Sequence, residues 1–166
     1  MFGVDTVGMK RLETGLTAAD IMQVDLVRLE PACTLRETIY AMTQARARYA
    51  IVEHAGAFEG LVSDRDVRFA LPSRLRSEQP GESDHLLDET TVDAVCIKRP
   101  YSVRPTDPAA DAARLMIHRR VGCLPVVDAE GRAIGMVTLE DFARIFVGLA
   151  ASDDETLSDT VRSLVA

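Results

Sequence analysis

The sequence lacks the residue patterns of a disulfide framework, a zinc site or a membrane protein. Its three cysteines, Cys33, Cys96 and Cys123, are far apart with no CxxC pair, and its three histidines are equally scattered. No apolar run approaches the length of a membrane-spanning helix, and residues 1–15 contain no apolar segment typical of a secretion signal. We therefore expect a cytoplasmic protein with no metal site and no membrane partner.

Basic residues are also scarce relative to acidic ones, because 26 Asp and Glu outnumber 19 Lys and Arg and leave a net charge of −7. Binding to a nucleic-acid backbone needs clustered Lys and Arg, so this balance argues against a nucleic-acid partner. A small anionic ligand needs only a local basic patch. The arginines that could form one are Arg46, Arg48, Arg65, Arg68, Arg119 and Arg120.

No known catalytic motif is visible in the chain. GxGxxG, GKS or GKT, and HExxH are all missing, and no nucleophile has a recognisable base beside it. We therefore predict that the protein is not an enzyme. Chemistry assembled at a dimer interface is the least favoured alternative.

An internal repeat organises the 166 residues, of which 47% are apolar. Residues 51–67 (IVEHAGAFEGLVSDRDV) resemble residues 126–142 (VVDAEGRAIGMVTLEDF) at an offset of 75, which pairs Val52 with Val127. Upstream the offset is 74 and pairs Met42 with Met116, so we place a one-residue insertion or deletion between Met42 and Ile51.

Each copy predicts the order strand, helix, strand, strand, helix. In the first copy Thr34 and Glu37 form a T-x-x-E capping box before a helical apolar stripe, and in the second Asp107 is the expected N-cap. We expect Gly122 to end the second helix. Two short apolar runs separated by a turn then predict a β-hairpin in each copy. Because a helix joins the first two strands, those strands should be parallel, which indicates an α/β (α+β) fold.

The repeats divide the chain into five parts. These are an N-terminal extension (1–16), repeat 1 (17–72), a polar linker with at most a short helical turn (73–90), repeat 2 (91–148) and a C-terminal tail (149–166). In the tail, Ser152 and Glu155 could form a further capping box.

The segments GLVSDRD and GMVTLED place Ser63 before Asp66 and Thr138 before Asp141 at the same spacing. A hydroxyl residue with an acid three positions later caps a helix and stabilises it by about 0.5 to 2 kcal/mol. The same helix N-terminus can attract a phosphate, and the carboxylate can accept the hydroxyls of a ribose. The pattern therefore fits a helix cap or a nucleotide site, and we favour Asp141 over Asp66 for a ligand.

The whole repeat resembles the cystathionine-β-synthase-type (CBS) domain, and the chain looks like a tandem CBS pair related by a pseudo-two-fold axis. The segments TLRETIYAM, YAIV, GLVSDRDV, AADAARLM and VGCLPVVDAEGRAIGMVTLEDF carry the resemblance. Small stand-alone proteins of the acetoin-utilisation type look most similar, through SDRDVRFALPS, the polar insert ending in LL, and IFVGL. The resemblance implies binding of an adenosine ligand (AMP, ADP, ATP, S-adenosylmethionine or NAD) between the repeats, with no obligatory cofactor, and assembly into a homodimer.

Matched residue by residue, the family's ribose site falls on Asp66 and Asp141, with Ser63 and Thr138 as hydroxyl partners. The remaining candidate nucleotide-binding residues are Arg48, Tyr49, Arg65, Gly122, Cys123, Leu124, Pro125 and Val137. The first copy has Ala50 where we align Pro125 in the second, so its adenine pocket should differ in shape. Arg65, Arg68, Arg46 and Arg48 could meet phosphates or lie on solvated surface. Cys123 is more typical of a small buried side chain than of a reactive thiol.

The apolar stripe of the last predicted helix, Phe142, Ile145, Phe146 and Leu149, indicates a core or dimer surface. We predict a regulatory module that senses an adenine nucleotide and transmits occupancy to an effector protein. The alternative is a structural or dimerisation module whose cleft is empty and whose two motifs act only as caps.

Overall fold

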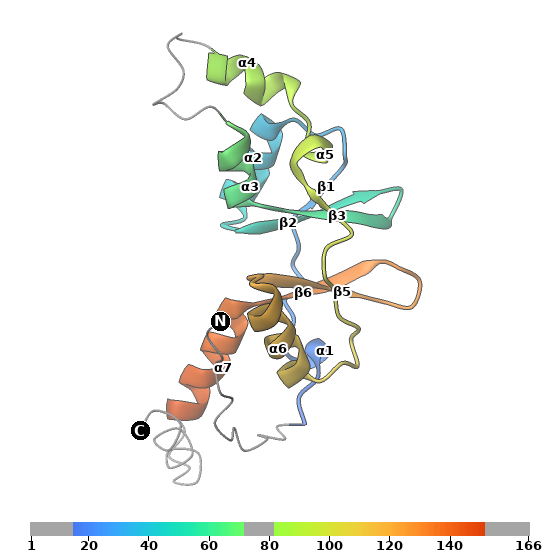
Figure 1. Ribbon diagram of the computed structural model, residues 1–166, viewed down its shortest axis with the longest axis vertical. Helices are drawn as coiled ribbons and strands as arrows, with labels where there is room; N and C mark the ends of the chain where they lie inside the picture. Colours follow the sequence, from blue (N-terminus) through green and yellow to red (C-terminus); the bar gives the residue numbers. More distant parts are fainter. Residues whose placement is uncertain (1–14, 72–81, 152–166) are drawn as a thin grey trace, which may run out of the picture.

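The computed structural model describes residues 15–71 and 82–151, which form two halves stacked along the long axis (Figure 1). The first half contains β1 (Arg28–Leu29), α2 (Leu35–Gln44), β2 (Tyr49–His54), β3 (Ala57–Ser63) and α3 (Asp64–Ala70). The second half contains α6 (Ala109–Arg119), β5 (Cys123–Val127), β6 (Ala133–Thr138) and α7 (Leu139–Ala151). The shorter elements are α1 (Ala18–Ile21), α4 (Glu82–Glu89), α5 (Val92–Val95) and β4 (Ile97–Lys98).

The predicted α+β fold of tandem repeats is confirmed. In the first half β1 pairs with β2 in parallel, with Leu29 opposite Val52, and β2 pairs with β3 in antiparallel. In the second half Val103 makes a parallel bridge to Val126, and β5 and β6 form the predicted hairpin. Each half thus has the parallel crossover through a helix that the pattern indicated.

The capping box of α2 is confirmed, whereas both predicted ends of α6 are wrong. The Glu37 carboxylate accepts from the Thr34 N–H at 2.8 Å, and the Glu37 N–H donates to the Thr34 hydroxyl at 3.2 Å. In α6 the N-cap is Pro108, and the Asp107 carboxylate instead accepts from the Arg104 N–H at 2.7 Å. The C-cap is Arg120 in the left-handed region (φ 55°), so the helix ends before Gly122.

The strand pairing also corrects the alignment of the two repeats. Because Tyr49 pairs with Ser63 and Cys123 with Thr138, the offset of 74 continues through the first hairpin strand. Val52 therefore corresponds to Val126, and the extra residue of the second copy lies in its hairpin turn. Ala50 corresponds to Leu124, and Pro125 corresponds to Ile51 rather than to Ala50 as predicted.

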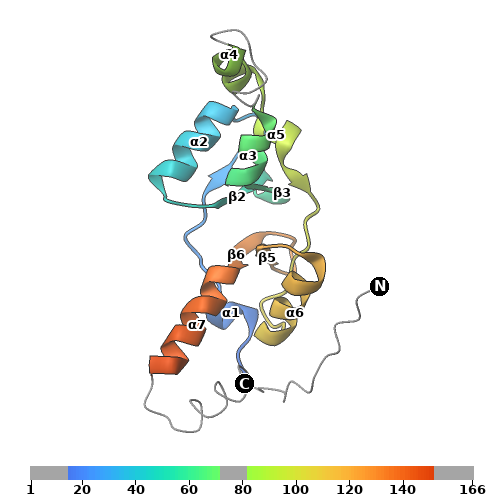
Figure 2. The same ribbon diagram turned by 60° about the vertical axis from the view of Figure 1, so that its left-hand side comes forward.

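The two halves exchange their N-terminal segments. Helix α1 packs on the second half, where Ala18 is buried in the same core as Ala112 and Leu124. Conversely α5 packs on the first half through Val92, and β4 pairs with β3. Figure 2 shows the two connecting segments that pass between the halves. This exchange was not predicted from the sequence, and it brings residues far apart in the chain to the same surface.

Each hairpin is covered on both faces, which explains why β2 and β5 are nearly continuous apolar runs. Ala50 and Val52 face the helices of the first half, whereas Ile51 faces the opposite hairpin. A separate cluster between the halves joins Ile51 and Leu61 to Cys123, Ala133 and Met136. This central layer packs the two halves against each other.

Helix α4 makes the linker more helical than predicted. It spans eight residues, and Asp88 forms an ion pair at 2.6 Å with Arg36 of α2. Residues 1–14, 72–81 and 152–166 lie outside the described residues, as do the Ser152–Glu155 box and the side chain of Leu149. Of the predicted apolar stripe, Phe142 packs on the core of the second half, whereas Phe146 is 51% exposed.

Candidate functional site: a cleft between the two halves

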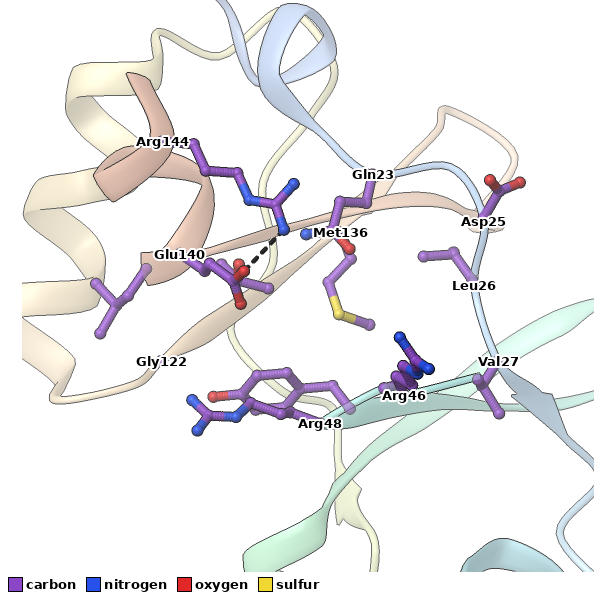
Figure 3. A pocket seen from close by; sticks show the side chains of 14 residues that line it. Gln23, Asp25, Leu26, Val27, Arg46, Arg48, Gly122, Met136, Glu140 and Arg144 are labelled. Carbon is purple, nitrogen blue, oxygen red and sulfur yellow. Dashed lines mark hydrogen bonds and ion pairs between the residues drawn. The ribbon is translucent and has the colours of Figure 1, made fainter. Parts of the chain in front are cut away.

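A cleft of about 190 Å³ lies between the halves and opens to solvent. Residues from three segments line it: Gln23, Asp25, Leu26 and Val27 of the exchanged segment, Arg46, Ala47, Arg48 and Tyr49 of the first half, and Gly122, Met136, Thr138, Leu139, Glu140 and Arg144 of the second half. In Figure 3 Arg46 and Arg48 lie on one side, while Glu140 and Arg144 lie on the other. The cleft therefore requires both repeats.

The wall from the first half is built where α2 turns into β2. Arg46 follows the helix in the left-handed region (φ 52°), which redirects the chain into the strand and leaves Arg46 and Arg48 exposed at the cleft. No carboxylate forms an ion pair with either arginine in residues 15–71 and 82–151. Their positive charge is consequently available to an anion.

The wall from the second half is built where β6 turns into α7. Glu140 and Arg144 stand one helical turn apart and form an ion pair at 2.8 Å, which raises the pKa of the Arg144 guanidinium above its ordinary value. The positive charge of Arg144 is therefore neutralised by Glu140, whereas Arg46 and Arg48 have no ion-pair partner among the described residues. Asp25 is an exposed carboxylate on the rim.

Asp141 lies directly behind the lining residues and is only 7% exposed. Its Oδ2 accepts from the Thr138 N–H at 2.8 Å and from the Thr138 hydroxyl at 2.7 Å, as expected for a helix cap. Its Oδ1 accepts from the Gln23 side-chain amide at 2.7 Å. Gln23 and Thr138 both line the cleft, so the Asp141 carboxylate is separated from the cleft by the residues to which it is hydrogen-bonded.

Asp66 occupies the equivalent position in the first half with fewer partners. Its Oδ2 accepts from the Ser63 N–H at 2.8 Å and from the Ser63 hydroxyl at 2.6 Å. The Asp66 N–H donates in turn to the Ser63 hydroxyl at 3.2 Å, which completes the predicted capping box. Within the described ranges no group donates to Asp66 Oδ1.

Tyr49 of one wall packs against Gly122 of the other. A Cβ built on Gly122 would lie 2.5 Å from the Tyr49 hydroxyl oxygen, so only glycine fits there without movement of the ring. Burial in this contact raises the pKa of the Tyr49 phenol, and the nearby Cys123 thiol adds to the shift. The phenol therefore stays neutral at physiological pH and can donate a hydrogen bond.

The structure distributes the predicted site residues over three environments. Arg48, Tyr49, Gly122 and Thr138 line the cleft, with Asp141 behind them. The side chains of Leu124 and Val137 lie in the core of the second half, Pro125 is fully buried, and Cys123 belongs to the central layer. Ser63, Asp66 and the exposed Arg65 lie at the start of α3 and do not line this cleft.

Burial also explains the chemistry of Cys123. Desolvation raises the pKa of this thiol well above its ordinary value, and the negative charge of Asp141 adds to the effect. The predicted role of a small buried side chain agrees with its 3% exposure.

Sequence reasoning missed Gln23 and the other exchanged residues of the cleft, which are Asp25, Leu26 and Val27. Nothing local in the segment IMQVDLV marks it as part of the second half. Glu140 and Arg144 could have been found, because they flank Asp141 at helical spacing.

Among residues 15–71 and 82–151, no group of three or more His, Cys, Asp or Glu side chains is placed to hold a metal ion. Over the same residues, every helix is too short or too polar to cross a membrane.

Comparison with known proteins identifies the two repeats. The family model described as "CBS domain" matches residues 18–73 and 92–148. A CBS domain-containing protein of Dictyostelium discoideum is 33% identical over 100 residues, which cover 60% of this chain and 69% of that protein. The inosine-5'-monophosphate dehydrogenase of Mycobacterium leprae is 31% identical over 143 residues, but the chain spans only 23% of that enzyme's length.

Solved structures with the same fold include proteins of similar size. A protein from Vibrio cholerae assigned to acetoin utilization superimposes with a TM-score of 0.68 and 28% identity, over 84% of this chain and 96% of that one. The complex of CBSX2 with AMP superimposes with a TM-score of 0.66 and 25% identity, over 81% of this chain and 98% of that one. The cytosolic domain of the Mg2+ channel MgtE, in complex with ATP, superimposes with a TM-score of 0.61 and 27% identity, over 78% of this chain and 48% of that one.

Proposed function

Because this chain belongs to the CBS domain family, we propose that it binds an adenine nucleotide between its two halves and acts as a regulatory module rather than as an enzyme. The observation that carries this proposal is the pairing of opposite chemistries across one cleft. Arg46 and Arg48, which form no ion pair among the described residues, line one wall, and Thr138 lines the other with Asp141 directly behind it. A ligand with an anionic end and a diol matches both.

In this proposal the ribose hydroxyls donate to Asp141 and the phosphates face Arg46 and Arg48. A phosphate charge about 4 Å from an arginine gains roughly 4 kcal/mol at an effective dielectric constant near 20, before desolvation is subtracted. Both arginines are exposed, so solvent screening reduces the net contribution of each to about 1 kcal/mol or less. Even that reduced contribution is relevant to micromolar binding, which totals about 8 kcal/mol.

AMP, ADP and ATP are the first ligands to test, since two of the similar solved structures are complexes with AMP and ATP. S-adenosylmethionine and NAD share the adenosine group and complete the set. Ser63, Arg65 and Asp66 occupy the corresponding positions of the first half, but they do not line this cleft, so we place the ligand at Asp141.

We further propose that the module works as a cytoplasmic homodimer that signals to an effector protein. Phe69 of α3 is 81% exposed, and Phe146 and Val147 of α7 are 51% and 65% exposed, so a second copy would cover apolar surface on both helices. A nucleotide that prefers one arrangement of the halves by roughly 1 to 3 kcal/mol would supply a coupling free energy typical of allosteric proteins, which the partner would sense. Sedimentation equilibrium measures the dimer directly.

Thermal unfolding with each of the five adenosine ligands tests the binding function. A single-site ligand at 100 times its dissociation constant adds about 2.7 kcal/mol, which for a chain of this size raises the melting temperature by about 5 to 10 °C. No shift with any ligand would contradict the proposal and favour the alternative of a structural module with an empty cleft.

Asp141→Asn and Asp66→Asn form a matched pair for locating the site, because both residues cap a helix from equivalent positions. We expect Asp141→Asn to abolish the nucleotide shift and Asp66→Asn to preserve it. Both variants should lower the apo stability by about 1 kcal/mol through the weakened cap. An unchanged shift in Asp141→Asn, with only the stability loss, would show that Asp141 is a cap alone.

A further inference from the structure

The two quasi-equivalent aspartates differ in how many hydrogen bonds they can still accept. A carboxylate offers about four acceptor positions, two on each oxygen. In Asp141 the two donors of Thr138 fill Oδ2, and the Gln23 amide takes a position on Oδ1. About one position therefore remains.

Asp66 retains both positions on Oδ1, because only the Ser63 N–H and hydroxyl donate to it within the described ranges. A ribose presents two adjacent hydroxyl groups, so it needs two acceptor positions. Asp66 could accept both hydroxyls as it stands. Asp141 could do so only if the Gln23 amide withdrew.

The difference comes from one residue of the exchanged segments. Gln23 bridges to Met136 of β6, and Ile97 pairs with Leu61 at the equivalent point of β3. Ile97 has no side-chain donor, so Asp66 keeps its free oxygen. The amide on Asp141 is thus a specific feature of the second half and not a consequence of the fold.

The geometry allows the Gln23 side chain to move while its backbone stays in place. Its N–H donates to the Met136 carbonyl at 2.9 Å and its carbonyl accepts from the Met136 N–H at 3.0 Å, which holds the main chain on β6. The residue is exposed and lines the cleft, so a rotated amide would meet solvent or the ligand rather than the core.

We infer that Gln23 competes with the ligand's ribose for Asp141, so that a nucleotide enters this cleft only by displacing the Gln23 amide. The inference rests on the proposed function and assigns Gln23 as the residue that sets affinity at that site. It also makes affinity depend on the diol, since a ligand without hydroxyl groups leaves the amide in place.

Isothermal titration of the full chain with AMP and with 2′,3′-dideoxy-AMP tests the competition. Gln23→Ala should bind AMP about three- to tenfold more tightly than wild type, which corresponds to one hydrogen bond of about 0.7 to 1.4 kcal/mol. Binding of 2′,3′-dideoxy-AMP should be unchanged. Gln23→Leu, which keeps the bulk but has no donor, should behave as Gln23→Ala does.

Ile97→Ala is the matched control, because it shortens the equivalent side chain in the other half without removing a hydrogen bond. We expect its affinity for AMP to equal that of wild type. An equal gain in Ile97→Ala, or an equal gain for the dideoxy ligand, would overturn the inference.

The two proposals fail in different ways. If neither wild type nor Gln23→Ala binds AMP or any of the other four adenosine ligands, the proposed function is wrong. If wild type binds AMP and Gln23→Ala binds it equally or more weakly, nucleotide binding stands and the competition by Gln23 is refuted.

Discussion

Gly135 is the position where a single methyl group should most directly disturb the exchanged segment beside the cleft. A Cβ built on this glycine would lie 2.3 Å from the sulfur of Met22, 2.8 Å from its Cγ and 3.1 Å from its Cβ. The glycine of GMVTLED therefore serves close packing between β6 and the segment that carries Gln23. We predict that Gly135→Ala destabilises the protein.

The magnitude follows from which atoms can move. The Met22 sulfur can rotate away, but its Cβ is fixed to a main chain that the hydrogen bonds between Gln23 and Met136 hold against β6. Overpacking of this kind costs about 1 to 3 kcal/mol, and the lower chain entropy of unfolded alanine offsets about 0.4 to 1 kcal/mol. The net loss is about 1 to 2 kcal/mol, or roughly 2 to 8 °C in melting temperature.

Urea unfolding of the apo protein, followed by circular dichroism, measures this loss. Gly148→Ala in α7 is the matched control, because no atom lies within 4 Å of a Cβ built there. That change should stabilise the protein by about 0.5 to 1 kcal/mol, since glycine is unfavourable inside a helix. A Gly135→Ala protein as stable as wild type, beside a stabilised Gly148→Ala protein, would refute the packing argument.

Two further outcomes follow from burial. The Thr38 hydroxyl is buried with no hydrogen-bond partner among the described residues, whereas the second half has the buried Ala112 at the equivalent position. Thr38→Val should therefore stabilise the protein by about 1 kcal/mol in urea unfolding. A stability equal to or lower than that of wild type would contradict this. The buried Cys123 thiol has a raised pKa, so iodoacetamide at pH 8 should alkylate Cys33 first; mass spectrometry showing Cys123 modified at the same rate would contradict its burial.

The elements of the fold were predictable because their signals are local. Thr34 and Glu37 mark the start of α2 within four residues, and Gly56 and Gly131 mark the two hairpin turns with φ angles of 80° and 82°. The α6 boundaries failed for a related reason. Asp107 and Gly122 are typical cap residues, but Asp107 bonds to the preceding turn and Gly122 serves the contact with Tyr49.

The cleft was predictable only in part because its walls come from non-local contacts. Thr138 and Asp141 could be found from their spacing, and Arg46 and Arg48 from their charge. Gln23 could not, since its role depends on the exchange that carries α1 onto the second half. The shift in repeat offset was also misplaced, because β2 and β5 both begin with apolar runs, YAIV and CLPVV, that can be aligned one residue apart. Their register is determined by the backbone pairing.

The capping motif alone therefore leaves the question of a ligand open, because capping uses only one oxygen of each aspartate. In both halves Oδ2 receives the N–H and hydroxyl of the preceding Ser or Thr. Whether the aspartate can also bind a ribose depends on Oδ1. In Asp141 this oxygen accepts from Gln23, which lies 118 positions away, whereas no group of the described residues donates to Oδ1 of Asp66. Two equivalent capping motifs can thus produce two unequal sites, and the residue that makes them unequal, Gln23, lies outside both motifs.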